Sequence, residues 1–372
     1  MICEAVEAGL KVGITAVSHK VIRNLLDEAV AASEEQGMEL RCVQKVRGEP
    51  KTNGSYQIRE TDKNSDVFRV LESGEAQVAA GTAWLWSREE AANSVDVLFV
   101  DEAGQISLAN TVAVSQAACS VVLLGDPQQL EQPKRGSHPD GTDVSALEHL
   151  LGEHQTMPPE RGLFLPTTWR LHPSICEFTS ELFYENRLRS RNGLETQNLL
   201  GHRVYEGAGL WFVPTEHEGN CNESLEEVEV VTQLVAELTA DGAAWTDSKG
   251  KSYPLTLGDI LIVAPYNAQV ASIMQRLPEE ARVGTVDRFQ GQEAPIVIYS
   301  MATSSPELAP RGMEFLYSAS RLNVATSRAR CACILVANPR LFEPDCRTPR
   351  QMKLANAFCR YLEMATIVPT ST

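Results

Sequence analysis

Two adjacent acids follow a short apolar run in the first third of the chain. The run Val97–Val100 leads into Asp101 and Glu102, and small residues follow the two acids. A buried parallel strand reads as such an apolar run, and α/β folds bind ligands at the carboxyl ends of these strands. The pair therefore predicts a phosphate site in which Asp101 holds Mg²⁺ and Glu102 polarises an attacking water. The alternative is a helix N-cap followed by a first-turn acid.

A second apolar run ends in a polar turn about twenty residues later. Val121–Leu124 precedes Gly125 and Asp126, and Gln129 follows. If the run is a neighbouring strand, the neutral amide of Gln129 lies where it could sense a phosphate. An ordinary β-turn is the alternative, because Gly-Asp-Pro is favourable turn sequence. The choice between the two readings depends on what else the chain contains.

Three further blocks combine arginines, aromatic residues and glycines: 169–178, 284–293 and 321–330. In this order, together with the two turns, the blocks resemble the motifs of superfamily 1 helicases. The 5′→3′ branch is the most similar, which includes the nonsense-mediated-decay helicase and the helicases fused to RecB-like nucleases. The resemblance extends from about residue 10 to about residue 340.

The resemblance implies an α/β fold with two RecA-like P-loop NTPase domains, each built on a parallel sheet, the first truncated at its N-terminus. We expect residues 1–165 to form the first domain, 166–345 the second, and 346–372 a C-terminal helix and tail. Apolar runs predict strands near 12–17, 40–43, 78–82, 97–100 and 121–124, then near 210–213, 260–264, 282–285, 296–300 and 332–337.

Other segments are assigned from their polarity and end signals. We expect polar surface loops at 47–66 and 239–254, and a frayed polar end after the C-terminal helix. Ser224, followed three residues later by Glu227, predicts a capping box at the start of a helix over 224–240.

The resemblance also implies roles at the nucleotide. Asp101 would bind Mg²⁺, Glu102 would act as the general base and Gln129 as the γ-phosphate sensor. Arg170 and Arg328 would reach the transferring phosphoryl from the second domain, where a guanidinium fork matches its equatorial oxygens. The remaining nucleotide-binding residues are Asp126, Trp169 stacking on adenine, Gly291 permitting close backbone approach, and Glu293 accepting from the ribose. The usual Gln-Tyr-Arg of the family is Thr-Trp-Arg at 168–170, so readout by the missing Gln is in doubt.

A nucleic-acid track is expected over the opposite face, where small hydroxyls and backbone amides contact phosphates without reading sequence. Its predicted residues follow strands: Ser18, His19, Thr82, Pro265, Tyr266, Asn267 and Thr285. Tyr266, Trp84 and Trp86 are candidates for base stacking, although alternation predicts that one of the two tryptophans packs in the core. The expected partner is single-stranded nucleic acid, DNA in preference to RNA.

No P-loop of the form Gly-x-x-x-x-Gly-Lys-Ser/Thr occurs in the sequence. Gly250-Lys251-Ser252 has Trp245 in place of the first glycine and precedes a predicted strand, so we interpret it as a loop. The first residues read as a helix that ends at Gly9, and in this family that helix begins in the P-loop. We therefore expect a fragment of a longer protein; an intact protein without a P-loop is the other interpretation.

Composition sets further limits. The net charge of −16 argues against broad, non-specific nucleic-acid binding but not against a narrow single-strand groove. The nine cysteines include no Cys-x-x-Cys pair, so we expect buried thiols in a reducing compartment and a cytoplasmic location. No apolar run approaches the roughly 18 residues of a membrane helix, and no signal peptide is evident.

The leading prediction is the motor of an ATP-dependent helicase or translocase that uses ATP and Mg²⁺, inactive as a fragment by itself. An upstream nuclease or P-loop-bearing segment is a possible companion. The alternative prediction is a non-catalytic module, derived from a helicase, that binds a single strand or a protein partner. A nuclease within these residues is not predicted, because no spaced carboxylate set with an adjacent lysine is found.

Overall fold

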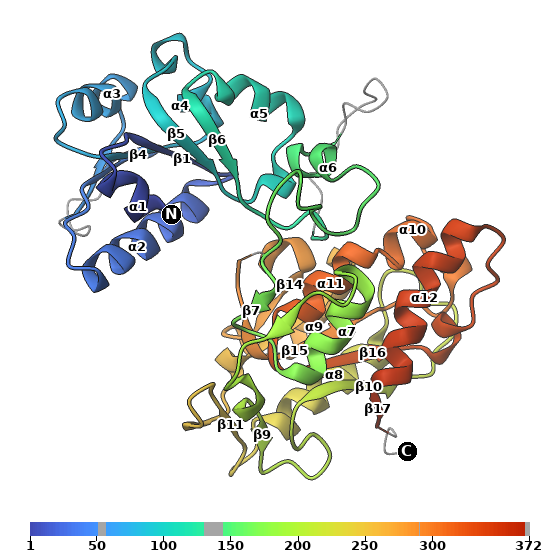
Figure 1. Cartoon of the computed structure of the whole chain (residues 1–372). Helices are drawn as coiled ribbons and strands as arrows, with labels where there is room; N and C mark the ends of the chain where they lie inside the picture. Colours follow the sequence, from blue (N-terminus) through green and yellow to red (C-terminus); the bar gives the residue numbers. More distant parts are fainter. Residues whose placement is uncertain (51–56, 130–143, 290, 369–372) are drawn as a thin grey trace. The chain divides into compact units, whose positions relative to one another are not determined.

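Two compact units make up the chain in the computed structural model, which describes residues 1–50, 57–129, 144–289 and 291–368. The N-terminal unit is Met1–His154 and the C-terminal unit is Gln155–Thr372 (Figure 1). This division lies earlier in the chain than the boundary expected at 165/166. Each unit contains its own parallel sheet, as the α/β prediction required.

The N-terminal sheet has the strand order β3-β2-β4-β1-β5-β6, and all its pairings are parallel. Its strands are β1 Val12–Thr15, β2 Cys42–Lys45, β3 Ile58–Thr61, β4 Val78–Ala80, β5 Val95–Val100 and β6 Ala118–Leu123. Its helices are α1 Ile2–Glu7, α2 His19–Glu35, α3 Asn64–Glu72, α4 Ala83–Trp86, α5 Leu108–Ser115 and α6 Ala146–Leu151, with short 3-10 turns at η1 Glu89–Ala91 and η2 Ala103–Gln105.

Helices cover both faces of this sheet (Figure 1). Apolar residues of α1 and α2 pack on the face that carries Val12 and Ile14. On the other face Trp86 of α4 is fully buried, and its indole nitrogen donates to the carbonyls of Ile14 at 3.0 Å and Gly81 at 3.1 Å. Gly13 makes room for it, because a Cβ there would meet the Trp86 ring at 3.1 Å and a Leu98 methyl at 2.8 Å.

Two predictions for the N-terminal unit are changed. β3 lies inside the segment expected to be a surface loop at 47–66; it is an edge strand with two polar residues in the middle, so it lacks an apolar signal. Trp84 and Trp86 lie on a short helix and not on a strand. The expectation that one of them is core still holds, since Trp84 is 85% exposed and Trp86 is buried.

The predicted helix stop at Gly9 is confirmed. Gly9 has φ +79°, its N–H donates to Val6 O at 2.9 Å, and the next N–H, of Leu10, donates to Ala5 O at 3.0 Å. This is a Schellman motif, in which a left-handed glycine satisfies the last carbonyls of a helix.

The C-terminal sheet has the order β14-β13-β15-β16-β10-β17, again entirely parallel. Its strands are β10 Gly209–Pro214, β13 Ile260–Ala264, β14 Arg282–Thr285, β15 Ala294–Ser300, β16 Ala329–Ala337 and β17 Thr366–Ile367. The helices are α7 Pro173–Phe183, α8 Leu225–Leu238, α9 Asn267–Arg276, α10 Met313–Leu316, α11 Ala319–Ser327 and α12 Pro349–Met364.

Small additions surround this sheet. β7 Thr167–Thr168 pairs with β8 Arg189–Ser190. β11 Ala244–Thr246 lies between β9 Leu199–Leu200 and β12 Ser252–Pro254 and pairs with both. The 3-10 turns are η3 Leu194–Thr196, η4 Leu257–Asp259, η5 Val286–Phe289, η6 Pro306–Leu308 and η7 Pro339–Phe342. Apolar residues of α8 and α9 pack on one face of the large sheet.

Three predictions for the C-terminal unit are wrong in part. The polar segment 239–254 contains the antiparallel hairpin β11–β12, and Gly250 forms its turn with φ +74°. The interpretation that Gly250-Lys251-Ser252 is no P-loop is thus confirmed. The segment after α12 was expected to be a frayed polar end, but its residues Thr366–Ile367 form β17, which pairs with β10. Ser224 caps α8 through the Glu227 amide, but the Glu227 side chain does not complete the capping box.

Candidate functional site

The acidic pair occupies a strained turn directly after β5. The amide of Asp101 continues the sheet ladder by donating to Thr15 O at 2.8 Å. Glu102 then adopts the left-handed conformation, with φ 53° and ψ 41°. A residue with a Cβ rarely adopts this conformation, which costs about 1–3 kcal/mol and is often found at functional sites.

The two carboxylates differ in their surroundings. Asp101 accepts from the Glu102 amide at 2.9 Å through Oδ1, while Oδ2 has no partner among the described residues. Burial raises the pKa of Asp101, and the hydrogen bond from Glu102 only partly opposes this effect. Glu102 Oε2 accepts from Gln105 Nε2 at 3.2 Å, which tethers its carboxylate over η2.

A partly buried carboxylate with one open oxygen fits Mg²⁺. This ion is usually held by one or two carboxylates together with substrate phosphates and water. Across the described ranges, no group of three or more His, Cys, Asp or Glu side chains could hold a metal by itself. The donor set is thus suited to a metal that arrives with a phosphate ligand and not to a closed protein site.

The second polar turn packs directly against the first. The amide of Ala103 donates to Leu124 O at 2.8 Å. A Cβ on Gly125 would lie 2.8 Å from the Ala103 nitrogen, and one on Gly104 would lie 2.7 Å from Asp126 O. Small residues are therefore required on both sides, and they bring the ends of β5 and β6 into contact.

Asp126 and Gln129 hold this turn together. Asp126 accepts from the Gln128 amide at 2.9 Å and from the Gln129 side-chain amide at 3.1 Å. The structure thus gives Asp126 a role in the turn; a role in binding a nucleotide stays a prediction. Gln129 is half-buried, and its side chain is oriented by Asp126.

The predicted arginines and Glu293 of the C-terminal unit lie at the amino ends of β15 and β16, which are neighbours in the sheet. Glu293 binds two of the arginines of this edge: Arg170 donates to it through Nε, and Arg330 donates through Nε at 3.0 Å and through its NH2 group. Burial acts to raise the pKa of Glu293, but Arg170 and Arg330 outweigh it and hold this pKa below its ordinary value.

This pairing gives Glu293 a role that was not predicted. Both carboxylate oxygens accept from guanidinium groups, so Glu293 orients two arginines, and its predicted contact with a ribose hydroxyl stays a prediction. Sequence reasoning gave Arg330 no role. Its position two residues after Arg328, at the start of a strand, was the available signal.

Arg328 is buried, at 4% exposure, and donates to Gln292 O at 2.8 Å. Arg328 is therefore an interior side chain and not part of a surface ion pair. Trp169 is the opposite case: it is 69% exposed, and the Arg191 guanidinium lies 3.9 Å from its ring centroid. One face of the Trp169 ring, which was predicted to stack on adenine, is therefore covered by the Arg191 guanidinium.

The structure gives Gly291 a conformational reason to be glycine, and its predicted role beside the nucleotide stays a prediction. Its φ is +71°, which favours glycine, and no described atom lies within 4 Å of where a Cβ would be. Close approach by another part of this chain is therefore not what demands glycine here.

The predicted nucleic-acid residues lie at the carboxyl edges of the two sheets. In the N-terminal unit, Ser18 caps α2 by accepting from Val21 N at 3.2 Å, and Thr82 caps α4 without a side-chain bond. His19 is half-buried; burial, followed by the neighbouring Lys45, lowers its pKa.

In the C-terminal unit the same edge is formed by the residues after β13 and β14. Asn267 is exposed and Thr285 half-buried, whereas Pro265 and Tyr266 are buried. The Tyr266 ring packs on Phe315 at 5.5 Å between centroids. The expectation that Tyr266 stacks on a base is therefore corrected: in this structure it supports another aromatic ring.

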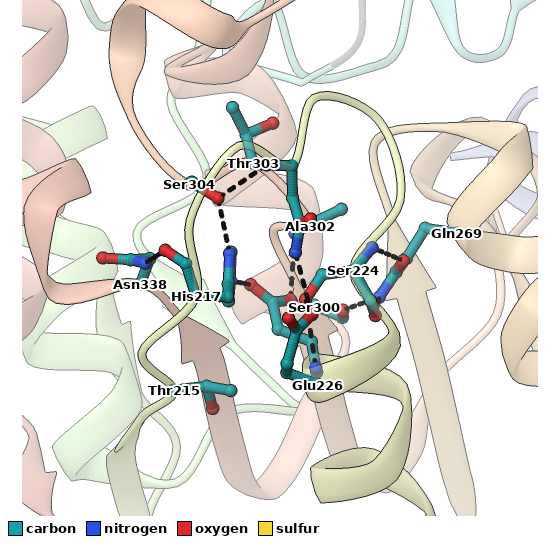
Figure 2. Close-up of polar contacts among 12 residues, drawn as sticks. Thr215, His217, Ser224, Glu226, Gln269, Ser300, Ala302, Thr303, Ser304 and Asn338 are labelled. Carbon is teal, nitrogen blue, oxygen red and sulfur yellow. Dashed lines mark hydrogen bonds and ion pairs between the residues drawn. The ribbon is translucent and has the colours of Figure 1, made fainter.

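A buried polar network lies next to this edge (Figure 2). Glu227 accepts from Ser300 Oγ at 2.6 Å and from the Ala302 amide at 2.9 Å, and its other oxygen lies 3.0 Å from His217 Nε2. His217 Nδ1 lies 2.7 Å from Ser304 Oγ. Because a carboxylate only accepts, His217 donates from Nε2 and can accept from Ser304 at Nδ1.

The order Ser304, His217, Glu227 resembles the Ser-His-acid arrangement of hydrolases. Here Ser304 is fully buried, the side chains of His217 and Glu227 have no exposed surface, and Ser304 Oγ also accepts from the Asn220 amide at 2.9 Å. No substrate could reach this serine. The network instead anchors the segment that follows β15.

Comparison with known proteins finds similarity to helicases. The chain is 27% identical over 270 residues to the probable helicase MAGATAMA 3 of Arabidopsis thaliana, and 29% identical over 286 residues to the putative helicase mov-10-B.1 of Danio rerio. A family profile described as an AAA domain matches residues 142–340, more than half of the chain. The chain belongs to this family, among the superfamily 1 helicases.

The matches cover only part of each relative. The aligned regions span 67% of this helicase chain in both cases, but 31% and 28% of the two relatives. The human probable helicase senataxin is 25% identical over 340 residues, which are 86% of this chain and 12% of senataxin. The two parallel sheets are accordingly the RecA-like domains of this family. Within the residues described for this helicase chain, no helix has the length and apolarity needed to cross a bilayer.

Proposed function

We propose that this chain carries the motor of an ATP-dependent helicase, which couples ATP hydrolysis to movement along single-stranded nucleic acid. The observation that supports this most is the contact between two turns: Asp101 and Glu102 after β5, and Gly125–Gln129 after β6. A half-buried carboxylate, a second carboxylate in a strained conformation and an oriented amide lie on neighbouring strand ends. This combination suits phosphoryl transfer to water.

Each side chain has a role in the proposal. Asp101 holds Mg²⁺, and the ion, when bound with the nucleotide, neutralises charge on the phosphates. Glu102 orients and deprotonates the attacking water, and Gln129 contacts the terminal phosphate through its amide. Arg170 and Arg328 stabilise negative charge on the transferred group.

The nucleic-acid partner is a single strand, with DNA proposed before RNA. The half-buried or exposed residues at the carboxyl edges, Ser18, His19, Thr82, Asn267 and Thr285, contact its phosphates. Such contacts hold any sequence, which is what a translocating motor requires.

The proposal is tested by ATP hydrolysis with and without a single-stranded oligonucleotide. Because the sequence contains no P-loop, we expect little turnover by the chain alone. A version in which a strand, a P-loop and the first turns of the helix are joined ahead of Ile2, so that they run into α1, should show ATPase activity that the single strand stimulates. In that version Glu102→Gln should lower turnover by at least about 100-fold. Undiminished turnover would exclude the role given to Glu102.

A second candidate function rests on the missing P-loop: a non-catalytic module that binds a single strand or a partner. It predicts single-strand binding by the chain, but no ATPase activity even after the P-loop is supplied. A chain that hydrolyses ATP once completed would exclude it, since the two functions differ only in turnover.

A further inference from the structure

Two arginines stack on one aromatic ring at the carboxyl edge of the C-terminal sheet, and no role considered so far includes them. The guanidinium carbons of Arg311 and Arg321 lie 4.0 and 4.1 Å from the centroid of the Phe315 ring. Tyr266, directly after β13, packs its own ring against Phe315. We call Arg311, Phe315 and Arg321 the Arg–Phe cluster.

The cluster carries two positive charges without an acidic partner. Across the residues with described positions, no carboxylate lies within 4.0 Å of either guanidinium. Glu314, the acid beside Phe315, is paired with Arg350 at 3.1 Å instead. Two cations on one ring repel each other, and in a chain of net charge −16 such a site is unusual. A bound anion would relieve the repulsion.

The cluster is accessible and its segment is anchored. Arg311 is exposed, and Phe315 and Arg321 are half-buried. The chain leaves β15 through Ala302, which has φ 67° and donates to buried Glu227, and then through Ser304, which contacts His217 (Figure 2). Anchoring of this kind lowers the ordering cost of binding.

We propose that the Arg–Phe cluster binds single-stranded nucleic acid, with the two guanidinium groups, held by the Phe315 ring, on successive phosphates. The proposal deepens the proposed function and rests on it. A guanidinium fork matches phosphate oxygens, and the cation–π contacts with Phe315 keep both forks close together. The distance between the two guanidinium carbons cannot exceed the sum of their distances to the Phe315 centroid. That sum is of the order of the spacing between successive phosphates in an extended strand. Asn267 and Thr285 lie at the same sheet edge.

The test is fluorescence anisotropy of a labelled short oligothymidylate, with the full chain, across a series of salt concentrations. Replacing both arginines (Arg311→Gln with Arg321→Gln) should weaken binding about tenfold or more and reduce the salt slope by about 1.4, since each phosphate contact on a single strand contributes about 0.7. Phe315→Leu should weaken binding about threefold or more, and less than the double arginine replacement, because both guanidinium groups remain but lose the ring that positions them. Circular dichroism would check that each variant folds.

A matched control removes two charges elsewhere in the C-terminal unit. Arg276 and Arg347 are exposed and paired with Glu229 and Asp345, and Gln at both positions should change affinity by less than about twofold. If wild type binds and the Arg311/Arg321 variant binds equally, or if the control loses as much, the cluster proposal is overturned while the proposed function stands. If wild type does not bind the single strand, the nucleic-acid part of the proposed function fails, and the cluster proposal fails with it.

Discussion

Arg170 and Glu293 are 123 residues apart in the chain and form an ion pair in the C-terminal unit. Glu293 holds Arg330 through its other oxygen, and Arg170 also donates to Ser327 O at 3.2 Å. One carboxylate therefore orients two arginines beside the buried Arg328. We infer from this arrangement that Glu293 positions the arginines for a phosphate; the predicted contact with a ribose hydroxyl is the alternative.

Glu293→Gln should show which of these roles is correct. We expect the melting temperature to fall by about 2–4 °C, because two charge-assisted bonds at a partly exposed site are weakened. In the P-loop-completed version, the affinities for ATP and 2′-deoxy-ATP should fall by the same factor, as measured by competition with a fluorescent nucleotide.

The matched control is Glu279→Gln, an exposed acid of the same unit, which should change neither quantity. Should wild type prefer ATP over 2′-deoxy-ATP and the Glu293 variant lose that preference, the carboxylate binds the ribose and the positioning role is wrong.

The backbone of Glu102 gives a prediction that needs no nucleotide. Because its φ is 53°, Glu102→Gly should raise the free energy of unfolding of the N-terminal unit by about 0.5–1 kcal/mol, while the completed enzyme loses turnover. Glu102→Gln should lose turnover without the gain in stability. Urea unfolding measures the first effect.

Asn93 provides the comparison, since it also has a positive φ, 54°, in the same unit. Asn tolerates this conformation better than Glu does, so Asn93→Gly should stabilise less than Glu102→Gly. Equal gains at the two positions would mean that Glu102 stores no particular strain.

Buried parallel strands were the most predictable part of the fold. The predicted strands 260–264 and 282–285 coincide with β13 and β14. The signal is clearest in β13, a run of buried apolar residues inside the sheet, which is the pattern of a strand covered on both faces. The edge strand β3 and the hairpin β11–β12 were missed, since each is half polar and short. Trp84 and Trp86 do divide between surface and core as predicted, but they lie on a helical turn and not on an alternating strand.

Only those site residues that directly follow a predicted strand could be placed from the sequence. Asp101 and Asp126 follow apolar runs, so their neighbourhood could be inferred from parallel topology. The pairing of Glu293 with Arg170, and the Arg191 cation on Trp169, depend on tertiary contacts that no sequence spacing encodes. For the same reason Glu227 was taken for a capping residue, although its side chain turns inward to His217.

Removal of the Glu227 side chain should strongly destabilise the C-terminal unit. Glu227→Ala leaves the buried donors of His217, Ser300 and Ala302 without an acceptor, so we expect a loss of about 3 kcal/mol. Hydrogen exchange at the Ala302 amide, measured by mass spectrometry, should become faster together with the loss in urea stability.

The neighbouring acid is the control. Glu226 accepts from Asn220 and Ser224 near the surface, so Glu226→Ala should cost less than about 1 kcal/mol. A fluorophosphonate reagent should leave Ser304 unlabelled in wild type; labelling would show that the buried serine is accessible and reactive, contrary to its structural role.

His172 should make the C-terminal unit sensitive to acid. It caps α7 by accepting from the Ser174 amide at Nδ1, at 3.2 Å, and burial lowers its pKa despite the opposing effect of Glu195. Folded protein thus binds this proton less tightly than unfolded chain. The stability that the neutral ring contributes is complete above its ordinary pKa of about 6.5 and is lost as the pH falls through the lowered folded value.

His172→Asn keeps an acceptor at the cap without titrating, so it should flatten the fall in melting temperature between about pH 7 and pH 5. His149→Asn, at an exposed position, should follow the wild-type curve; a His172→Asn curve as steep as wild type would place the acid sensitivity elsewhere, for example at the buried His202.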